Sequence, residues 1–227
     1  MRPSQCAVCR DWGHGRLCDL CLNRFASPIC RCRRCAASVP DHVEVCGACL
    51  IEPPSFASTL AAVSYVPPWN GLINDFKFRN ALDLADSLAL LLLRAHSHQA
   101  GAPPSLMLPV PLNAARLTDR GYNQSWELAH RCARRLGCQA DSGLLVRIKD
   151  TSRQASLSRE QRATNMRGAF AVEPTRRAEI RGRSITLVDD VMTTQATADE
   201  AARTLLAAGA LSVDMWVVAR TPAPHDQ

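Results

Sequence analysis

The sequence has few aromatic residues, almost no lysine and no long uncharged apolar run. Aromatic residues make up 5% of the 227 residues, which argues against base stacking as a main source of affinity for single-stranded nucleic acid. The longest apolar segment begins at Leu84 but is interrupted by Asp86 and Arg94, so it predicts a buried helix instead of a membrane span. The first residues lack the apolar core of a signal peptide. We therefore expect a cytoplasmic protein with no membrane span.

The basic residues are nearly all arginine, and they are unevenly distributed. The formal net charge is +6, and only two of the 27 basic residues are lysine. Between Arg116 and Arg183 there are 15 basic and 7 acidic residues, which gives this segment a net charge of +8. Such a segment suits a polyanionic ligand, either a pyrophosphate or a nucleic acid. The alternative is an ordinary solvated basic surface.

Nine of the eleven cysteines lie before residue 50, and eight of these form four C-x2-C pairs. Two such pairs supply four thiolates to one tetrahedral zinc ion, so four consecutive pairs predict two structural zinc sites in a double zinc ribbon. We favour sequential pairing of the four pairs, while a crossed arrangement stays open. The expected ligands are Cys6, Cys9, Cys18 and Cys21 for the first ion, and Cys32, Cys35, Cys46 and Cys49 for the second.

Other uses of these cysteines are less consistent with the sequence. A reducing cytoplasm argues against a disulfide framework, and no thioredoxin-like βαβ unit accompanies the C-x2-C pairs. Four thiolates alone do not distinguish zinc from an iron–sulfur cluster. Cys30 lies outside the pairs and could compete with Cys32 for a ligand position. Cys132 and Cys138 are expected to be buried apolar residues.

Pro53 and Pro54 mark the boundary between the cysteine-rich module, 1–52, and the main domain, 53–227. The module has little apolar content, so metal binding is expected to supply its folding free energy. Arg31, Arg33 and Arg34 beside the third pair favour a phosphate contact, and a purely structural role is the alternative.

The segment from Ser184 to Gly209 combines a strand, two acids, a hydroxyl-rich loop and a helix. Residues 185–188 predict a buried parallel strand that leads directly into Asp189 and Asp190. The N–H groups at a helix start attract phosphate, and adjacent carboxylates suit vicinal sugar hydroxyls or a metal. An ordinary βα turn with capping acids is the alternative. The loop residues are Val191, Met192, Thr193, Thr194, Gln195, Ala196 and Thr197.

Two further segments carry candidate ligands for a diphosphate. Residues 105–108 predict a strand that Pro109 and Pro111 end in a stiff turn, and residues 123–136 predict a helix. Arginine and amide side chains after such a turn could hold a pyrophosphate, with helix capping and surface ion pairs as the alternative. The basic segment after a strand at 144–148 could close over phosphates, with a short helix from Arg159. The candidates are Leu112, Arg116, Arg120, Asn123, Gln124 and Arg153.

The alternation of predicted strands and helices indicates an α/β fold with a mostly parallel sheet. Further strands are expected at 59–66, 168–172 and 211–219, with helices ending near Phe78 and starting near Leu82. Lys77 and Arg79 lie near the end of the first of these helices, where an ordinary surface role has at least as much support as a functional one. In such sheets ligands bind beyond the carboxyl ends of the strands, so the Asp189 and Pro109 segments are expected to share one pocket.

The chain resembles the ComF family of competence proteins. The resemblance rests on the double C-x2-C ribbon, PVPLNAARLTDRGYNQ from Pro109, RQASLSREQRATNMRGAF from Arg153 and LVDDVMTTQAT from Leu187. It implies a type I phosphoribosyltransferase-like sheet that binds phosphoribosyl pyrophosphate (PRPP) with Mg²⁺, and a link to DNA uptake in natural transformation. By this resemblance Asp189 and Asp190 hold the ribose hydroxyls and the Val191–Thr197 loop holds the 5′-phosphate. Gln195 stands where the family usually has glycine, so a positive φ there would be strained.

Three functional hypotheses follow from these observations. The first is a PRPP-dependent transferase in which pyrophosphate leaves, with catalysis by positioning and electrostatics. The second is a non-catalytic PRPP sensor whose ribbon and basic face contact single-stranded DNA or the DNA-uptake machinery. The third is a zinc-dependent scaffold with a degenerate pocket. The sequence names neither an acceptor nor an oligomeric state.

Overall fold

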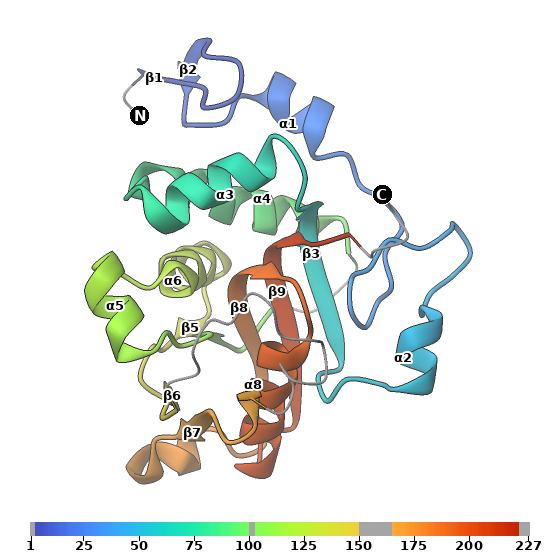
Figure 1. Cartoon of the computed structure of the whole chain (residues 1–227), viewed down its shortest axis with the longest axis vertical. Helices are drawn as coiled ribbons and strands as arrows, with labels where there is room; N and C mark the ends of the chain where they lie inside the picture. The colour runs from blue at the N-terminus through green and yellow to red at the C-terminus, as the bar shows by residue number, and fades with distance from the viewer. Residues whose placement is uncertain (1–2, 100–102, 150–164, 223–227) are drawn as a thin grey trace.

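A five-stranded parallel sheet organises the chain (Figure 1). The computed structural model describes residues 3–99, 103–149 and 165–222. All four strand pairs in the sheet are parallel, which confirms the α/β class expected from the sequence. In spatial order the strands are β3 (Ser58–Ser64), β9 (Ser212–Arg220), β8 (Ser184–Met192), β4 (Leu106–Pro109) and β5 (Gln139–Ala140).

The central strand β8 is buried on both faces, which explains its continuous apolar run. Its side chains alternate between two cores, so Val188 packs with one cluster and Leu187 with the other. The first core lies under α3 (Trp69–Phe78), α4 (Ala85–Ser97) and α6 (Gln124–Leu136). The second lies under α8 (Ala196–Ala207) and the two-stranded sheet of β6 (Leu145–Arg147) and β7 (Phe170–Val172).

Short elements connect these layers. A 3-10 turn, η1 (Leu82–Leu84), leads into α4, and a second, η2 (Pro174–Glu179), follows β7. Helix α5 (Ala114–Arg120) lies between β4 and α6 and buries none of its residues. Asn123 then caps α6, because its side chain accepts hydrogen bonds from the backbone N–H groups of Ser125 and Trp126. Gly137 ends α6 in the left-handed conformation at φ 70.

The cysteine-rich module consists of two similar halves. In the first, a turn joins β1 (Pro3–Gln5) to β2 (Trp12–His14) and is followed by α1 (Asp19–Phe25). The second half has a similar turn and ends in α2 (Gly47–Ile51). In each half, the residue after a C-x2-C pair has a positive φ, 68 at Arg10 and 55 at Ala36. Cys18 and Cys46 each precede a short helix, so the halves are a structural repeat.

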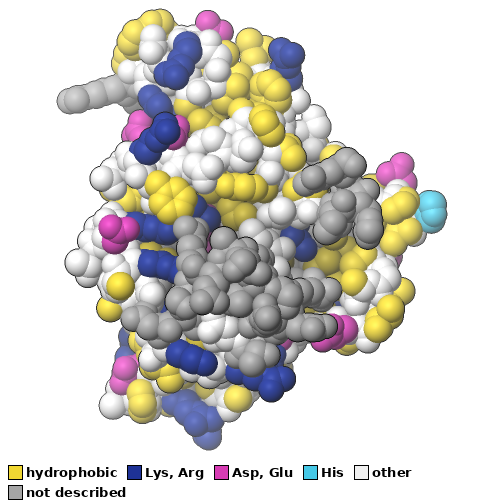
Figure 2. All heavy atoms as spheres, viewed as in Figure 1, with side chains coloured by type: hydrophobic (Ala, Val, Ile, Leu, Met, Phe, Trp, Pro, Cys, Tyr) yellow, Lys and Arg dark blue, Asp and Glu magenta, His cyan; other side chains and the backbone are white. Residues whose placement is uncertain are grey.

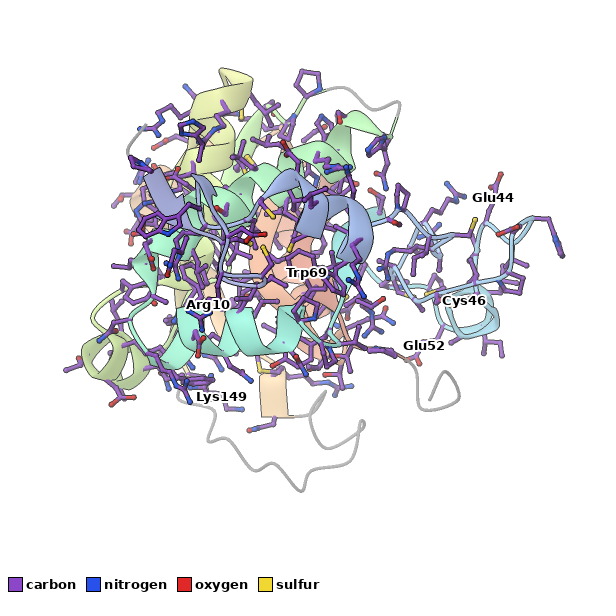
Figure 3. All side chains as sticks on the ribbon, turned by 90° about the horizontal axis from the view of Figure 1, so that it is seen from above. Arg10, Glu44, Cys46, Glu52, Trp69 and Lys149 are labelled. Carbon is purple, nitrogen blue, oxygen red and sulfur yellow. The ribbon has the colours of Figure 1, made fainter. Side chains whose placement is uncertain are left out.

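The two halves of the module pack against different parts of the main domain (Figures 1 and 3). The first half lies over α3 and α4, where Trp69 Nε1 donates to the carbonyl of Phe25 at 2.8 Å. The second half lies beside β3, and Thr59 donates to the carbonyls of Arg33 and Arg34 from its N–H and hydroxyl. In Figure 3, Trp69 lies beneath the first half, and Cys46 marks the second half at the side of the molecule.

The strands and helices largely match the sequence predictions, with four differences. Strand β8 continues to Met192, four residues beyond the predicted end, because Val191 and Met192 still pair with β9. Strand β4 includes Pro109, and the N–H of Val110 donates to Val188. Helix α5 was not predicted, and β6 pairs antiparallel with β7 outside the main sheet. The predicted helix from Arg159 begins outside the described residues.

No helix within residues 3–99, 103–149 and 165–222 combines the length and apolar character needed to cross a membrane.

Two glycines test the assignment of helix interiors and ends. Gly71 lies inside α3, and Gly137 ends α6 at a positive φ; a Cβ at either position would meet open space. We expect Gly71→Ala to stabilise the protein by about 0.5–1 kcal/mol, because it removes backbone freedom from the unfolded chain. Gly137→Ala should destabilise it by about 1–2 kcal/mol, since alanine is strained in the left-handed region. Urea unfolding of both variants measures the two changes in the free energy of unfolding. Equal changes would contradict the placement of Gly71 inside α3 and of Gly137 at the left-handed end of α6.

Candidate functional site

Two adjacent carboxylates form the centre of the candidate site. Asp189 and Asp190 belong to the last part of β8, at the carboxyl end of the parallel sheet. The hydroxyl of Ser125, from the first turn of α6, donates to Asp189 Oδ1 at 2.9 Å. Lys77 Nζ, near the end of α3, lies 2.9 Å from Asp190 Oδ1 in an ion pair whose side chains are 16% and 7% exposed. The acid pair is therefore held between two helices from the same face of the sheet.

Each acid uses only one of its two oxygens for contacts with the described residues. Asp189 Oδ1 accepts from Ser125 and from the N–H of Asp190, and Asp190 Oδ1 accepts from Lys77 and from the N–H of Val191. Among the described residues, neither Oδ2 atom takes part in a hydrogen bond or an ion pair. A carboxylate oxygen accepts two hydrogen bonds, so this arrangement leaves two neighbouring acceptors for a ligand with two hydroxyls.

The environment of Asp189 disfavours its ionised form. Burial, followed by the neighbouring charge of Asp190, raises the pKa of Asp189 to about 7, against the opposing effect of Lys77. Asp189 nevertheless keeps part of its surface exposed to solvent, so a ligand can reach it. An acid with a pKa near neutrality that lies next to a charged partner is typical of a functional site.

Residues around the start of α6 hold the end of α3 that carries Lys77. The hydroxyl of Tyr122 donates to the carbonyl of Phe76, and Gln124 Nε2 donates to the carbonyl of Lys77 at 3.3 Å. Both carbonyls belong to the last turn of α3, where no intrahelical donor is available. Tyr122, Gln124 and Ser125 thus tie the end of α3 and the acid pair to a single stretch of chain.

A short loop joins the acid strand to α8. It contains Thr193, Thr194 and Gln195, and the helix begins at Ala196. The loop and first turn present backbone N–H groups with no intrahelical acceptor, at the positive end of the helix dipole. Thr194 and Thr197 are half-buried and Thr193 is exposed. This arrangement is suited to a phosphate group.

The loop differs from the sequence prediction in its length. Val191 and Met192 belong to the strand, and the Met192 side chain is buried in the core. Ala196 and Thr197 belong to the first turn of α8. The phosphate-binding positions expected at 191–197 therefore divide into strand, loop and helix.

Gln195 carries no backbone strain. Its φ is −72 and its ψ is −7, which places it in the ordinary helical region. The strain that a glycine position would imply is absent here, because this loop needs no positive φ at residue 195.

The candidate pyrophosphate residues do not all lie together. Arg120 lies 4.7 Å from the centre of the Phe78 ring and donates to Gln124 Oε1 at 3.1 Å, which places it beside the end of α3. Asn123 donates to the carbonyl of Val110 and caps α6, so the capping alternative holds for this residue. Of the other candidates, Leu112 lies between β4 and α5, Arg116 lies in α5, and Arg153 lies outside the described residues.

Sequence reasoning missed Ser125 and left two alternatives open for Lys77. Of the two alternatives for Lys77, the surface role does not hold, since the side chain is mostly buried and paired with Asp190. Arg79, by contrast, is 79% exposed and pairs with Asp75. The spacing along α3 contained a signal for Lys77, because it lies four residues after the buried Ile73 and so on the same face of the helix.

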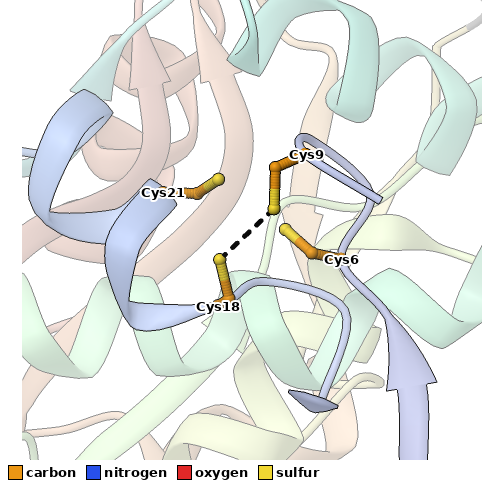
Figure 4. A group of neighbouring side chains, drawn as sticks. All are labelled: Cys6, Cys9, Cys18 and Cys21. Atoms are coloured by element: carbon orange, nitrogen blue, oxygen red, sulfur yellow. Dashed lines mark hydrogen bonds between the residues drawn. The ribbon is translucent and has the colours of Figure 1, made fainter. Parts of the chain in front are cut away.

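The eight paired cysteines form two groups of four, as Figure 4 shows for the first. Within each group the sulfur atoms all lie within 4.8 Å of one another, and the grouping is sequential. The distance is 3.6 Å between the sulfurs of Cys9 and Cys18, and also between those of Cys35 and Cys46. A tetrahedral zinc ion with Zn–S bonds of about 2.3 Å requires sulfur separations of about 3.8 Å. Both groups therefore fit a zinc ion.

The backbone around each cluster favours thiolates. Burial acts to raise the pKa of Cys6 and Cys32, yet backbone N–H donors lower the pKa to about 6 and about 7, respectively. For Cys32 one such donor is the N–H of Cys46, at 3.3 Å. Cys30 is exposed and belongs to neither group, and Cys132 is buried in α6, as expected. The donor set and its environment are those of a structural metal site.

Basic side chains and one large cavity lie elsewhere on the main domain. Figure 2 shows Lys and Arg side chains over the region of α5 and of the β6–β7 hairpin. A separate cavity of about 700 Å³ lies near the opposite ends of β3 and β8 and is lined by His96, Arg183 and Trp216 among others. It is distant from the acid pair along β8.

The chain is similar along nearly its whole length to curated bacterial proteins. It is 34% identical over 227 residues to DNA utilization protein YhgH of Escherichia coli K12, covering 96% of this chain and 98% of that protein. It is 32% identical over 224 residues to competence protein F of Haemophilus influenzae, covering 95% and 96%. No protein-family model matches the chain.

Solved structures with local similarity include phosphoribosyl enzymes. The glutamine PRPP amidotransferase of B. subtilis shares 17% identity with a TM-score of 0.39 over 59% of this chain, which spans 25% of that enzyme. Adenine phosphoribosyltransferase of Leishmania donovani shares 13% identity with a TM-score of 0.38, covering 66% of this chain and 70% of that one.

The cysteine groups predict the metal content of the protein. The purified full chain should contain about two zinc ions, one for each group of four. Cys18→Ala and Cys46→Ala should each reduce the content to about one, because three thiolates hold zinc less tightly than four. Cys30→Ala is the matched control and should retain both ions. Elemental analysis by mass spectrometry measures the content, and a loss of zinc from the Cys30 variant would contradict the assignment.

The raised pKa of Asp189 predicts a pH-dependent change in stability. Its folded-state pKa of about 7 lies above the unfolded value of about 3.9, so ionisation of this acid removes stability as the pH rises through that window. Asp189→Asn keeps the acceptor for Ser125 and removes the charge beside Asp190. The melting temperature of the variant relative to the native chain should therefore be higher at pH 8 than at pH 5.

The control for this measurement is Glu44→Gln, an exposed acid in the second half of the module. Its relative melting temperature should change little between the two pH values. A constant difference for Asp189→Asn across pH 5 to 8 would show that Asp189 is ionised throughout.

Proposed function

Because this chain belongs to the ComF family, which contains competence protein F and DNA utilization protein YhgH, we propose that it is a PRPP-binding, phosphoribosyltransferase-like protein that acts in the uptake or use of DNA. The observation that supports this most is the acid pair, whose hydrogen bonds and ion pair with described residues use Oδ1, in the strand that leads through the 193–195 loop into the first turn of α8. A ribose 5-phosphate unit has the matching groups, two neighbouring hydroxyls and one phosphate.

In this proposal each part of the ligand meets a different element. The ribose hydroxyls donate to Asp189 and Asp190 Oδ2, while Lys77 and Ser125 keep both Oδ1 atoms engaged. The 5′-phosphate accepts hydrogen bonds from the N–H groups at residues 193–197 and from the threonine hydroxyls. Because Lys77 balances the negative charge of Asp190, a phosphate can bind near the acid pair without strong repulsion from two unpaired carboxylates.

Arg120 is the described residue best placed to attract the pyrophosphate group. It lies at the end of α5, beside the last turn of α3 that carries Lys77. Asn123 and Gln124 use their amides to hold α6 and α3, so we assign them positioning roles. Arg116 and Leu112 remain predictions for this group. In a transferase the Arg120 guanidinium would contribute to catalysis by positioning the pyrophosphate and stabilising the departing charge.

Mg²⁺ is the metal that the ligand chemistry favours. The acids offer oxygen donors, which hard divalent cations prefer, and a bound Mg²⁺ would neutralise pyrophosphate oxygens. The carboxylates of Asp189 and Asp190 are the residues that would bind it, directly or through water and the ribose hydroxyls. A non-catalytic PRPP sensor remains the alternative function, and pyrophosphate release distinguishes it from a transferase.

Thermal unfolding tests the proposal. PRPP with Mg²⁺ at about 100 times its dissociation constant stabilises a protein by about 2.7 kcal/mol, which for a chain of this size raises the melting temperature by about 5–10 °C. The Asp189→Ala/Asp190→Ala double variant should lose this shift, since both hydroxyl acceptors are gone. Asp119→Ala, an exposed acid of α5, is the control and should keep it.

Absence of a shift in the native chain would overturn the proposal. If the shift occurs, release of pyrophosphate is measured with a panel of nucleobases and related amines as acceptors. Release that depends on an acceptor supports the transferase, whereas stabilisation without release across the panel supports the sensor.

A further inference from the structure

One arginine side chain connects the second cysteine group to the loop that follows the acid strand. Arg220 is the last residue of β9, and its guanidinium donates only to backbone carbonyls in the described residues. Its Nε donates to Cys35 at 2.9 Å, and its Nη1 donates to Met192 at 3.0 Å and Thr193 at 2.8 Å. Cys35 is a thiol of the second group, while Met192 and Thr193 are the positions where β8 ends and the loop begins.

The geometry of this link depends on the turn formed by the pair Cys32 and Cys35. The carbonyl of Cys35 precedes Ala36, which has a positive φ and donates its N–H to the carbonyl of Cys32 at 2.7 Å. A bound metal would hold this turn closed, because Cys32 and Cys35 are both ligands of the same group. The direction of the Cys35 carbonyl towards Arg220 is thus set by the turn that the thiols fix.

Charge complementarity points to the same coupling. Four thiolates and one Zn²⁺ carry a net charge of −2. Two arginines lie beside this group: Arg220, and Arg31, which donates to the carbonyl of Ala36 and to the hydroxyl of Ser64. Ser64 is paired with Arg220 between β3 and β9, so both guanidinium groups are at the same end of these strands. No ion pair with a carboxylate is recorded for either arginine among the described residues.

A second contact joins the end of the module to the same helix start. The N–H of Ser55 donates to Asp199 Oδ1, in the first turn of α8, at 2.6 Å. Phe56, the next residue, is fully buried in the core that also contains Ala198. The second half of the module thus reaches one side of the 193–195 loop through Arg220, and Ser55, three residues after the module ends, contacts the other side through Asp199.

Among the residues that the structure describes, no hydrogen bond or ion pair joins the first half of the module to the 192–199 segment. That half lies on α3 and α4, through Trp69 and through the N–H of Arg16, which donates to the hydroxyl of Ser87 at 3.2 Å. The two halves share the same cysteine pattern and differ in what they touch. Each therefore serves as the control for the other.

We propose that Arg220 is a positioning residue that couples metal binding at the second cysteine group to the order of the 193–195 loop, so that loss of metal there, and not at the first group, loosens the loop and weakens phosphate binding. The structural part of this inference stands on Arg220 and its carbonyl partners alone. Its consequence for ligand affinity rests on the proposed function.

Hydrogen–deuterium exchange of the zinc-loaded full chain tests the coupling without any ligand. Three variants are compared with the native chain: Cys46→Ala, Cys18→Ala and Arg220→Lys. Cys46 is chosen because it belongs to the second group but shares no hydrogen bond with Arg220 among the described residues. Arg220→Lys keeps the charge and removes the planar fork that reaches several carbonyls at once.

We expect amide exchange in the peptide covering 192–198 to become about tenfold faster in Cys46→Ala and in Arg220→Lys, since directed hydrogen bonds to the loop are lost. Arg220→Lys should still contain two zinc ions, which separates the link from the metal. Cys18→Ala should lose one ion and leave exchange in this peptide unchanged. If Cys46→Ala fails to fold, loop exchange in Arg220→Lys against the native chain decides whether the Arg220 link orders the loop, because both proteins contain two zinc ions.

Unchanged loop exchange in Arg220→Lys would overturn the proposal, as would equal acceleration in the two cysteine variants. Affinity for PRPP with Mg²⁺, and for inorganic phosphate, is then measured by calorimetry and should fall about tenfold in Cys46→Ala and Arg220→Lys. If the native chain binds neither probe, the proposed function fails, while the exchange result still decides the coupling.

Discussion

Two adjacent carboxylates at the end of a buried strand impose the main constraint on this structure. A buried charge without a partner costs several kcal/mol, so each acid requires a donor that the fold delivers in a fixed place. Lys77 meets this need for Asp190, and Ser125 meets it for Asp189. The segment before α6 in turn holds the end of α3 through Tyr122 and Gln124. The packing of α3 and α6 against the sheet is therefore tied to the protonation and orientation of the acid pair.

The cysteine-rich module extends this principle to the rest of the site. Its first half packs on α3 and α4, on the side of the sheet that supplies Lys77, and its second half contacts the ends of β9 and the start of α8. The two halves thus contact two different parts of the main domain that flank the proposed ligand site. In the proposal, thiolate–metal bonds stiffen a module that has little apolar core of its own, and Arg220 carries that effect to the main domain.

Much of the fold and part of the site follow from local sequence patterns. The parallel strands, the acid pair and the two groups of cysteines depend on short spacings, so the sequence predicts them. The pairing of Lys77 with Asp190 depends on the packing of α3 against β8, which no local pattern encodes. The end of β8 was misplaced because pairing with β9 carries the strand through the acids. Gln195 was expected to be strained from a family pattern, whereas the actual loop is short and enters α8 in a helical conformation.

The central claim is that the two Oδ2 atoms of the acid pair and the first turn of α8 bind one ribose 5-phosphate unit. A crystal structure of the zinc-loaded chain with PRPP and Mg²⁺ tests it most directly. The account predicts ribose hydroxyls within about 2.5–3.2 Å of Asp189 and Asp190 Oδ2, and a phosphate at the N–H groups of residues 193–197. An acid pair that stays empty at saturating ligand, or density only in the cavity beside Arg183 and Trp216, would contradict it.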